Sequence, residues 1–234
     1  RENAGVLDGS TLGKIEIKGK DALAFMNLIY TNSFSKMKPG TSRYALMLGE
    51  DGMVKDDGII CKISDEHFIA TTTTGGAATV LGCMEEYAQT EWPNLNVYMN
   101  SITEQYATFN ISGPKTRNII EKVFPEVNCS NEAFPFMTFQ FHEYEDTPIR
   151  ILRASFTGEM GYEIYIPSNQ ALKIWGKIIS FGKEFGLMPY GTETMHLLRA
   201  EKGYIIVGQD TDGSITPLDL GCLLYTSPSP RDIT

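Results

Sequence analysis

The sequence contains few of the residue patterns that mark metal sites, disulfide frameworks or membrane spans. Its 234 residues include only four cysteines and three histidines, which are Cys61, Cys83, Cys129, Cys222, His67, His142 and His196. These are widely scattered, so neither a metal-ligand spacing nor a disulfide framework is predicted. The thiols are therefore expected to be reduced, as in a cytoplasmic protein. No run of about 18 apolar residues occurs, so the sequence predicts no membrane span.

Positive charge is also scarce. The chain has 20 Lys and Arg against 29 Asp and Glu, which gives a net charge of −9. A nucleic-acid backbone requires clustered Lys and Arg, and no such cluster is present, so nucleic acid is not an expected partner. The Gly-x-Gly-x-x-Gly pattern of dinucleotide-binding proteins is missing too. The first residue is Arg1 rather than Met, and we expect the chain to be part of a longer protein.

The elements that are present indicate a mixed fold. Residues 14–18 alternate polar and apolar side chains, as a half-buried strand does, and residues 22–29 then carry apolar side chains at helical spacing. Residues 43–48, 53–63 and 68–72 are predicted as further strands. Because strands and helices are interleaved with hairpin-like pairs, the sequence predicts an α+β fold with antiparallel sheets and flanking helices.

The acidic run Phe156-Thr-Gly-Glu-Met-Gly-Tyr-Glu163 is the most informative motif. The glycines allow a turn, and the apolar alternation after Glu163 predicts a strand. A carboxylate held at such a junction can accept two parallel N–H bonds from a flat heterocycle. On spacing alone, an acidic surface hairpin is the favoured interpretation.

Two further clusters contain candidate site residues. Lys55-Asp56-Asp57 enters an apolar strand, so the two aspartates should point to opposite faces, and one of them would then lie inward beside a donor or ligand. On spacing alone, two solvated turn aspartates are the favoured interpretation. Arg199 lies in the predicted last helix and could bind a carboxylate, although a surface Arg–Glu pair would explain it as well. Residues 210–213 lack most of a calcium loop, and residues 71–76 lack the Gly-Lys-Ser/Thr of a phosphate loop.

Three motifs together resemble one known family. Gly-Met-Val-Lys-Asp-Asp (52–57), the run at 156–163 and Leu-Arg-Ala-Glu-Lys-Gly (198–203) followed by Gly-Gln-Asp (208–210) are similar to the folate-binding aminomethyltransferases, the family of the glycine cleavage T-protein. Within that family, residues 71–77, 132–137 and 190–212 resemble the carboxyl-terminal half of sarcosine oxidase alpha subunits. The resemblance covers residues 1–221.

The resemblance implies a T-protein-like folate-binding fold whose usual carboxyl-terminal barrel domain is missing from this chain. It also implies the one-carbon chemistry of a heteromeric sarcosine oxidase, in which the methylene carbon of oxidised sarcosine (an imine) passes to tetrahydrofolate and leaves glycine. Flavin (FAD or FMN) and NAD are expected elsewhere in the complex, and flavin-bearing and smaller subunits are the implied partners.

Five residues are carried over from the family by position. Asp56 matches the aspartate near the point of one-carbon transfer, and Glu163 matches the glutamate that binds the pterin ring. Phe156 stands where the T-protein usually has tyrosine, Tyr44 lies near a position that lines the folate site, and Arg199 matches an arginine near it.

The expected domain organisation has a larger discontinuous lobe and a smaller inserted one. Residues 1–43 and 102–221 are assigned to the larger folate-binding lobe, residues 44–101 to the inserted lobe, and residues 222–234 to an unstructured tail of foreign origin. Three alternatives to the sarcosine oxidase interpretation stay open: a T-protein-type aminomethyltransferase, a folate-dependent demethylase, and a non-catalytic module with the same fold.

Overall fold

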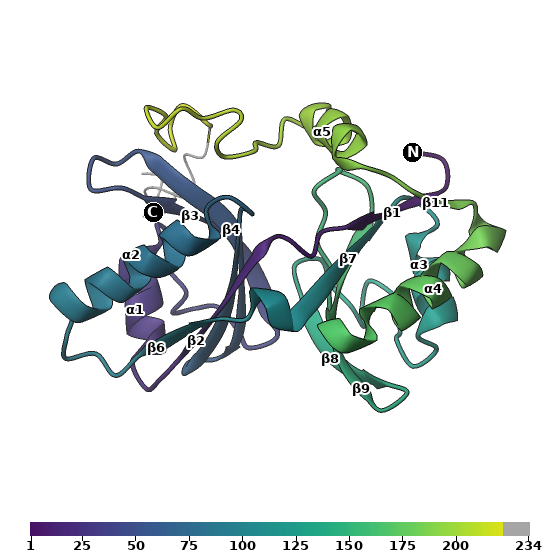
Figure 1. The fold of residues 1–234 in the computed structure, drawn as a ribbon, viewed down its shortest axis with the longest axis horizontal. Coiled ribbons are helices and arrows are strands. Elements are labelled where there is room, and N and C mark those ends of the chain that lie inside the picture. Colours follow the sequence, from purple (N-terminus) through teal and green to yellow (C-terminus); the bar gives the residue numbers. More distant parts are fainter. Residues whose placement is uncertain (222–234) are drawn as a thin grey trace. The chain divides into compact units, whose positions relative to one another are not determined.

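The computed structural model describes residues 1–221, which form two compact units. The first unit contains residues 1–11 and 103–204, and the second contains residues 12–102 and the described residues from 205 onward. Figure 1 labels the helices and strands of both units. The predicted foreign tail, residues 222–234, lies outside the described residues.

The first unit is built on a six-stranded sheet. In spatial order its strands are β11 (Leu187–Pro189), β1 (Ala4–Asp8), β7 (Tyr106–Ser112), β10 (Gly161–Pro167), β9 (Thr147–Leu152) and β8 (Phe139–Tyr144). Only the β1–β11 pair is parallel among these strands. Strand β10 lies between β7 and β9, and all its residues from Gly161 to Ile166 are buried.

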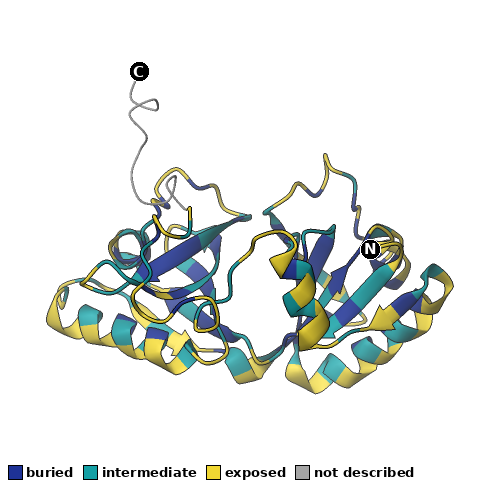
Figure 2. Ribbon diagram, turned by 90° about the horizontal axis from the view of Figure 1, so that it is seen from above, coloured by how far each residue is buried: buried dark blue, intermediate teal, exposed yellow. Residues whose placement is uncertain are grey.

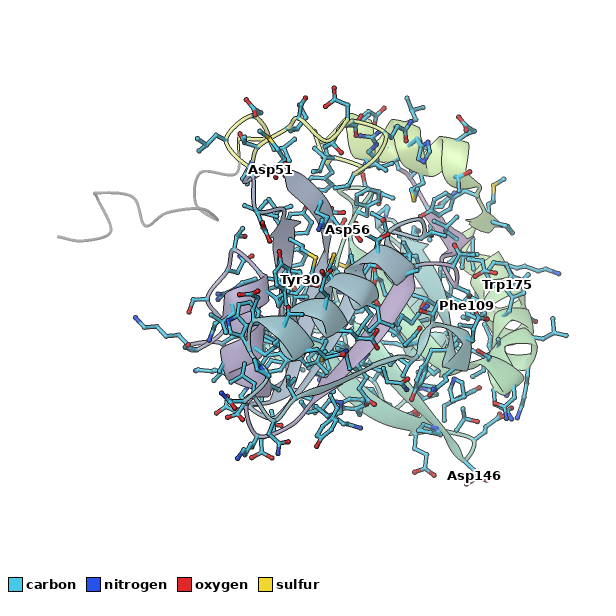
Figure 3. The ribbon with its side chains drawn as sticks, turned by 60° about the vertical axis from the view of Figure 1, so that its left-hand side comes forward. Tyr30, Asp51, Asp56, Phe109, Asp146 and Trp175 are labelled. Carbon is cyan, nitrogen blue, oxygen red and sulfur yellow. The ribbon has the colours of Figure 1, made fainter. Side chains whose placement is uncertain are left out.

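Helices cover one face of this sheet. Helices α3 (Thr116–Val123) and α4 (Ala171–Gly182) turn their apolar sides to the strands, and α5 (Thr192–Ala200) follows β11. Three short 3₁₀ turns, η1 (Thr103–Gln105), η2 (Ser168–Gln170) and η3 (Lys183–Phe185), complete the unit. Phe109 of β7 meets Trp175 of α4 edge to face with ring centroids 5.0 Å apart, which fixes the helix on the sheet (Figure 3).

The second unit has a five-stranded, fully antiparallel sheet. Its spatial order is β3 (Thr41–Leu48), β4 (Val54–Ser64), β5 (His67–Thr72), β2 (Gly13–Lys18) and β6 (Tyr98–Ser101). Helices α1 (Ala22–Ile29) and α2 (Ala77–Thr90) pack on one face and enclose a core that contains Phe25, Met26, Phe68 and Met84. Figure 2 shows buried strands and helices with exposed outer faces in each unit.

The α+β prediction with antiparallel sheets and flanking helices is confirmed. The domain boundaries differ from those expected. The structure places residues 12–43 in the second unit, because β2 pairs with β5 and β6 and α1 packs into the same core. Residues 205–221 also group with that unit, where the Val54 N–H donates to the Ile215 carbonyl oxygen (2.8 Å).

Candidate functional site

The five predicted site residues divide between the two units. Phe156, Glu163 and Arg199 belong to the first unit, and Tyr44 and Asp56 belong to the second.

Glu163 is a buried carboxylate in the central strand of the first unit. The turn before β10 uses Gly158 with φ +73°, and β10 then pairs with β7 and β9 on its two sides. Glu163 is only 8% exposed. Its Oε1 accepts a hydrogen bond from Asn110 Nδ2 (3.1 Å), and its Oε2 accepts one from the Tyr165 hydroxyl (2.6 Å). The alternative of a surface hairpin therefore does not hold for Glu163.

The other acid of the motif does behave as a surface residue. Glu159 accepts a hydrogen bond from the Arg1 guanidinium (2.7 Å), and both side chains are partly exposed. Such a pair contributes little to stability. The run at 156–163 thus combines one surface carboxylate with one buried carboxylate.

The sequence analysis missed the residues that surround Glu163. Asn110 lies directly opposite Glu163 on β7, and Tyr165 lies two residues further along β10, on the same face. Arg150 on β9 lies opposite Tyr165, with its guanidinium carbon 4.1 Å from the tyrosine ring centroid. Because this grouping depends on strand pairing between distant segments, the local sequence carries no signal for it.

Phe156 and Arg199 meet through Tyr204 in the first unit. The rings of Phe156 and Tyr204 are stacked, with an interplanar angle of 19° and centroids 6.3 Å apart. Arg199 Nη1 donates to the Tyr204 carbonyl oxygen (2.9 Å), and Arg199 is 7% exposed. Arg199 is therefore a buried residue that fixes the end of α5, and the alternative of a surface Arg–Glu pair does not describe it.

Asp56 points into the second unit, as the alternation in β4 predicts. It lies opposite Met47, whose side chain belongs to the core, and it is 2% exposed. Its Oδ1 accepts hydrogen bonds from the backbone N–H groups of Asp57 (2.9 Å) and Thr73 (3.4 Å). Its Oδ2 is buried and has no hydrogen-bond partner among the described residues. Burial raises the pKa of Asp56, and the hydrogen bonds from Asp57 and Thr73 oppose that effect.

The loop before α2 adapts closely to Asp56. A Cβ atom added at Gly76 would lie 2.3 Å from Asp56 Oδ2, so only glycine fits there without movement. Thr73 Oγ1 accepts a hydrogen bond from the Gly76 N–H (3.0 Å) in the turn that leads into this helix. Asp56 and this loop thus form one tightly packed arrangement.

Asp57 points to the opposite face and is not one of the five predicted site residues. Its Oδ2 accepts a hydrogen bond from the Tyr44 hydroxyl (2.7 Å), so the structure pairs Tyr44 with Asp57. Burial raises the pKa of Asp57 to about 6; the Tyr44 hydrogen bond lowers it, and the charge of Asp56 raises it further. The charges of both aspartates, together with burial, also raise the pKa of Tyr30 (Figure 3). Asp57 is therefore a carboxyl group that titrates close to neutral pH.

A separate cavity of about 890 Å³ opens in the second unit. Its lining includes Glu50, Asp51, Lys55, Cys83 and Tyr87 but none of the five predicted site residues. Lys55 Nζ donates to Cys83 Sγ (3.2 Å), and the Tyr87 hydroxyl donates to Glu50 Oε1 (3.1 Å). The cavity and the predicted carboxylates are thus distinct features.

Two negative findings apply to the described residues 1–221. No group of three or more His, Cys, Asp and Glu side chains there is arranged to hold a metal ion. No helix in that range is long and apolar enough to cross a lipid bilayer.

Several known enzymes are similar to the chain in sequence. It is 52% identical over 222 residues to the sarcosine oxidase subunit alpha of Corynebacterium sp. (strain P-1), a match that covers 94% of this chain and 23% of that protein. It is 32% identical over 221 residues to the aminomethyltransferase of Chlorobium limicola, of which the match covers 59%. The chain thus spans about a quarter of the alpha subunit and under two thirds of the transferase.

Solved structures show the same fold. The glycine cleavage system aminomethyltransferase T from Bartonella henselae superimposes with a TM-score of 0.82 over 97% of this chain and 58% of that one, at 23% identity. The heterotetrameric sarcosine oxidase from Corynebacterium sp. U-96 matches with a TM-score of 0.58 over 78% of this chain and 85% of that one, at 12% identity. The family described as the GCVT N-terminal domain matches residues 1–227, and the chain therefore belongs to this family of glycine cleavage T-protein-like domains.

Proposed function

We propose that the chain is the folate-binding part of a heteromeric sarcosine oxidase. Its role there is to bring the one-carbon unit of oxidised sarcosine to tetrahydrofolate, which gives methylene-tetrahydrofolate and glycine. The 52% identity to a sarcosine oxidase subunit alpha supports this assignment. Because the chain spans 23% of that relative, the activity of the whole protein is part of the proposal.

The observation that carries the proposal is the buried, oriented carboxylate of Glu163. Its Oε1 accepts a hydrogen bond from Asn110 and its Oε2 accepts one from the Tyr165 hydroxyl, and these contacts fix the orientation of the carboxylate. A fixed carboxylate of this kind matches the adjacent N–H donors of a pterin ring. The residues present thus fit a reduced folate, and we assign pterin binding to Glu163, with Phe156, Arg199 and Tyr44 as further folate-contacting residues.

The Asp56–Asp57 pair is the proposed group for proton movement and charge stabilisation. The family position assigns this role to Asp56, whose Oδ2 is buried without a partner in the described part of the chain. The raised pKa of Asp57 makes that residue the second candidate, because a carboxyl group with a pKa of about 6 can both accept and return a proton near neutral pH. Separate Asp56→Asn and Asp57→Asn variants distinguish the two.

Partners and compartment follow from the same assignment. The matched sarcosine oxidase structure is a heterotetramer, and we propose that this chain likewise belongs to a hetero-oligomer. Its flavin-bearing and smaller subunits would carry out the oxidation of sarcosine, with FAD or FMN and NAD bound outside this chain. The cytoplasm is the proposed compartment.

The test is an assay of the full-length protein with its co-purified partners. Sarcosine and tetrahydrofolate are supplied together, and glycine, methylene-tetrahydrofolate and free formaldehyde are measured. We expect Glu163→Gln to lose most of the methylene-tetrahydrofolate while sarcosine is still oxidised and formaldehyde is released. Equal yields of methylene-tetrahydrofolate in wild type and variant would remove Glu163 from the site.

The second candidate is a T-protein-type aminomethyltransferase. The 32% identity to such an enzyme and the TM-score of 0.82 to an aminomethyltransferase T favour it. This enzyme would act on an aminomethyl-lipoyl carrier without a flavin partner. Purification without any flavoprotein, together with activity on such a carrier, would support it over the sarcosine oxidase assignment.

A further inference from the structure

Arg150 is a buried cation without a carboxylate partner among the residues the structure describes. It lies in β9, is 5% exposed and takes part in no ion pair there. Its Nε and Nη1 atoms are buried and donate no hydrogen bond to any residue in the same range. Burial of an unpaired charge opposes folding, so we expect another interaction to offset the cost of burying the Arg150 guanidinium.

The interaction that Arg150 does make leads directly to Glu163. The Arg150 guanidinium lies over the ring of Tyr165, 4.1 Å from its centroid, and the Tyr165 hydroxyl donates to Glu163 Oε2 at 2.6 Å. The three side chains share one face of the sheet, because Arg150 is opposite Tyr165 and Glu163 is two residues before Tyr165 on the same strand. Together they form a continuous series from cation to ring to carboxylate.

The physical effect of this series is to hold and polarise the carboxylate. A cation over the ring face draws electron density from the phenol, which makes its hydroxyl a stronger donor. A hydrogen bond from a polarised donor to a charged acceptor is short and strongly oriented. Tyr165 is 2% exposed, so its side chain is shielded from solvent that would compete for the hydrogen bond to Glu163.

We propose that Arg150 and Tyr165 are positioning residues that set the orientation of Glu163 toward the two adjacent N–H donors of a pterin ring. This inference rests on the proposed function, because it assumes that Glu163 binds the pterin. It adds a specificity role: Arg150 and Tyr165 make the site select heterocycles that carry a 2-amino group next to a ring N–H.

The test compares two ligands on the full-length protein. Dissociation constants are measured for 5-formyltetrahydrofolate and for its 2-desamino-2-methyl analogue, which lacks the amino group that Glu163 would bind. The wild type should prefer the parent compound by about tenfold, the factor expected for one hydrogen bond to a charged group. Tyr165→Phe and Arg150→Met should reduce that preference at least threefold, and Arg150→Lys should restore most of it because a cation remains over the ring.

The chain offers a matched control on the same sheet. Tyr144 also has a cation over its ring, since Lys177 Nζ lies 4.9 Å from the ring centroid and donates to the Tyr144 hydroxyl (3.1 Å). Tyr144→Phe and Lys177→Met remove an equivalent contact away from Glu163, so the preference should be unchanged in both. If Arg150→Met does not fold, Arg150→Gln replaces it as the variant without a cation, and Tyr165→Phe still tests the hydroxyl that contacts Glu163.

Each outcome has one meaning. Loss of the preference in Glu163→Gln, Tyr165→Phe and Arg150→Met, with both controls intact, supports the proposal. Loss in Glu163→Gln alone, or an equal loss of affinity for both ligands in Tyr165→Phe, overturns the positioning role and leaves the proposed function standing. Absence of folate binding by the wild type overturns the proposed function and this inference with it.

Discussion

Replacement of Asp57 by asparagine is expected to stabilise the protein above pH 6. In the folded protein burial raises the Asp57 pKa to about 6 from its ordinary value of 3.8. The folded state therefore binds the proton more tightly than the unfolded state, and ionisation of Asp57 opposes folding. The contribution of Asp57 to stability is most favourable below pH 4 and is lost as the pH rises from about 4 to about 6.

The magnitude follows from the difference between the two pKa values. A gap of about two pH units corresponds to about 3 kcal/mol in the free energy of unfolding, at 1.36 kcal/mol for each unit. The difference in unfolding free energy between Asp57→Asn and wild type should therefore increase by about 2–3 kcal/mol from pH 4 to pH 7. Other titrating groups cancel in this comparison because both proteins contain them.

Urea denaturation of the full-length protein, followed by intrinsic fluorescence at several pH values, measures this difference. The Asp56→Asn variant is the matched companion. Removing the Asp56 charge lowers the Asp57 pKa, so the pH-dependent step of that variant should be smaller and should lie at lower pH. Parallel pH profiles for wild type and Asp57→Asn would show that Asp57 does not titrate near neutral pH and would refute the reasoning.

Two further predictions concern packing and the folate-contacting rings. A Cβ atom at Gly58 would lie 1.8 Å from the Thr71 carbonyl oxygen, whereas nothing lies within 4 Å of one at Gly75. Gly58→Ala should therefore lower the free energy of unfolding by about 1–3 kcal/mol. Thermal denaturation checks this: a decrease in melting temperature no larger than that of the Gly75→Ala control would contradict the prediction. Phe156→Leu removes the ring stack on Tyr204 and should weaken reduced-folate binding about fivefold in calorimetry. Phe156→Tyr keeps the stack and should bind reduced folate as the wild type does. Equal weakening in both variants would argue against stacking as the cause.

Local patterns in the sequence were sufficient to predict β2, α1, β3, β4 and β5 of the second unit. The polar–apolar alternation of residues 14–18 and the helical spacing of residues 22–29 correspond to β2 and α1, because each pattern reflects one buried face. The assignment of residues 12–43 to a unit depended instead on long-range strand order. Strand β2 lies between β5 and β6 in the sheet, and no feature of residues 12–43 themselves indicates those neighbours.

The candidate site shows the same limit at the level of side chains. The alternation of β4 correctly indicated that Asp56 and Asp57 face opposite ways, but the partner of Asp57 is Tyr44, which the fold supplies from β3. The burial of Glu163 depends on pairing with β7, whose Asn110 lies 53 residues earlier in the chain. Sequence spacing identified the residue types, and the environments that set their chemistry arise from strand pairing.

Calorimetric titration of the full-length protein with 5-formyltetrahydrofolate, in wild type and Glu163→Ala, tests the central claim most directly. The account predicts saturable binding by the wild type and a loss of about 1–3 kcal/mol of binding free energy in the variant, the cost of leaving buried donors unpaired. Binding of equal strength in both proteins, or no binding by a folded wild-type protein, would contradict it.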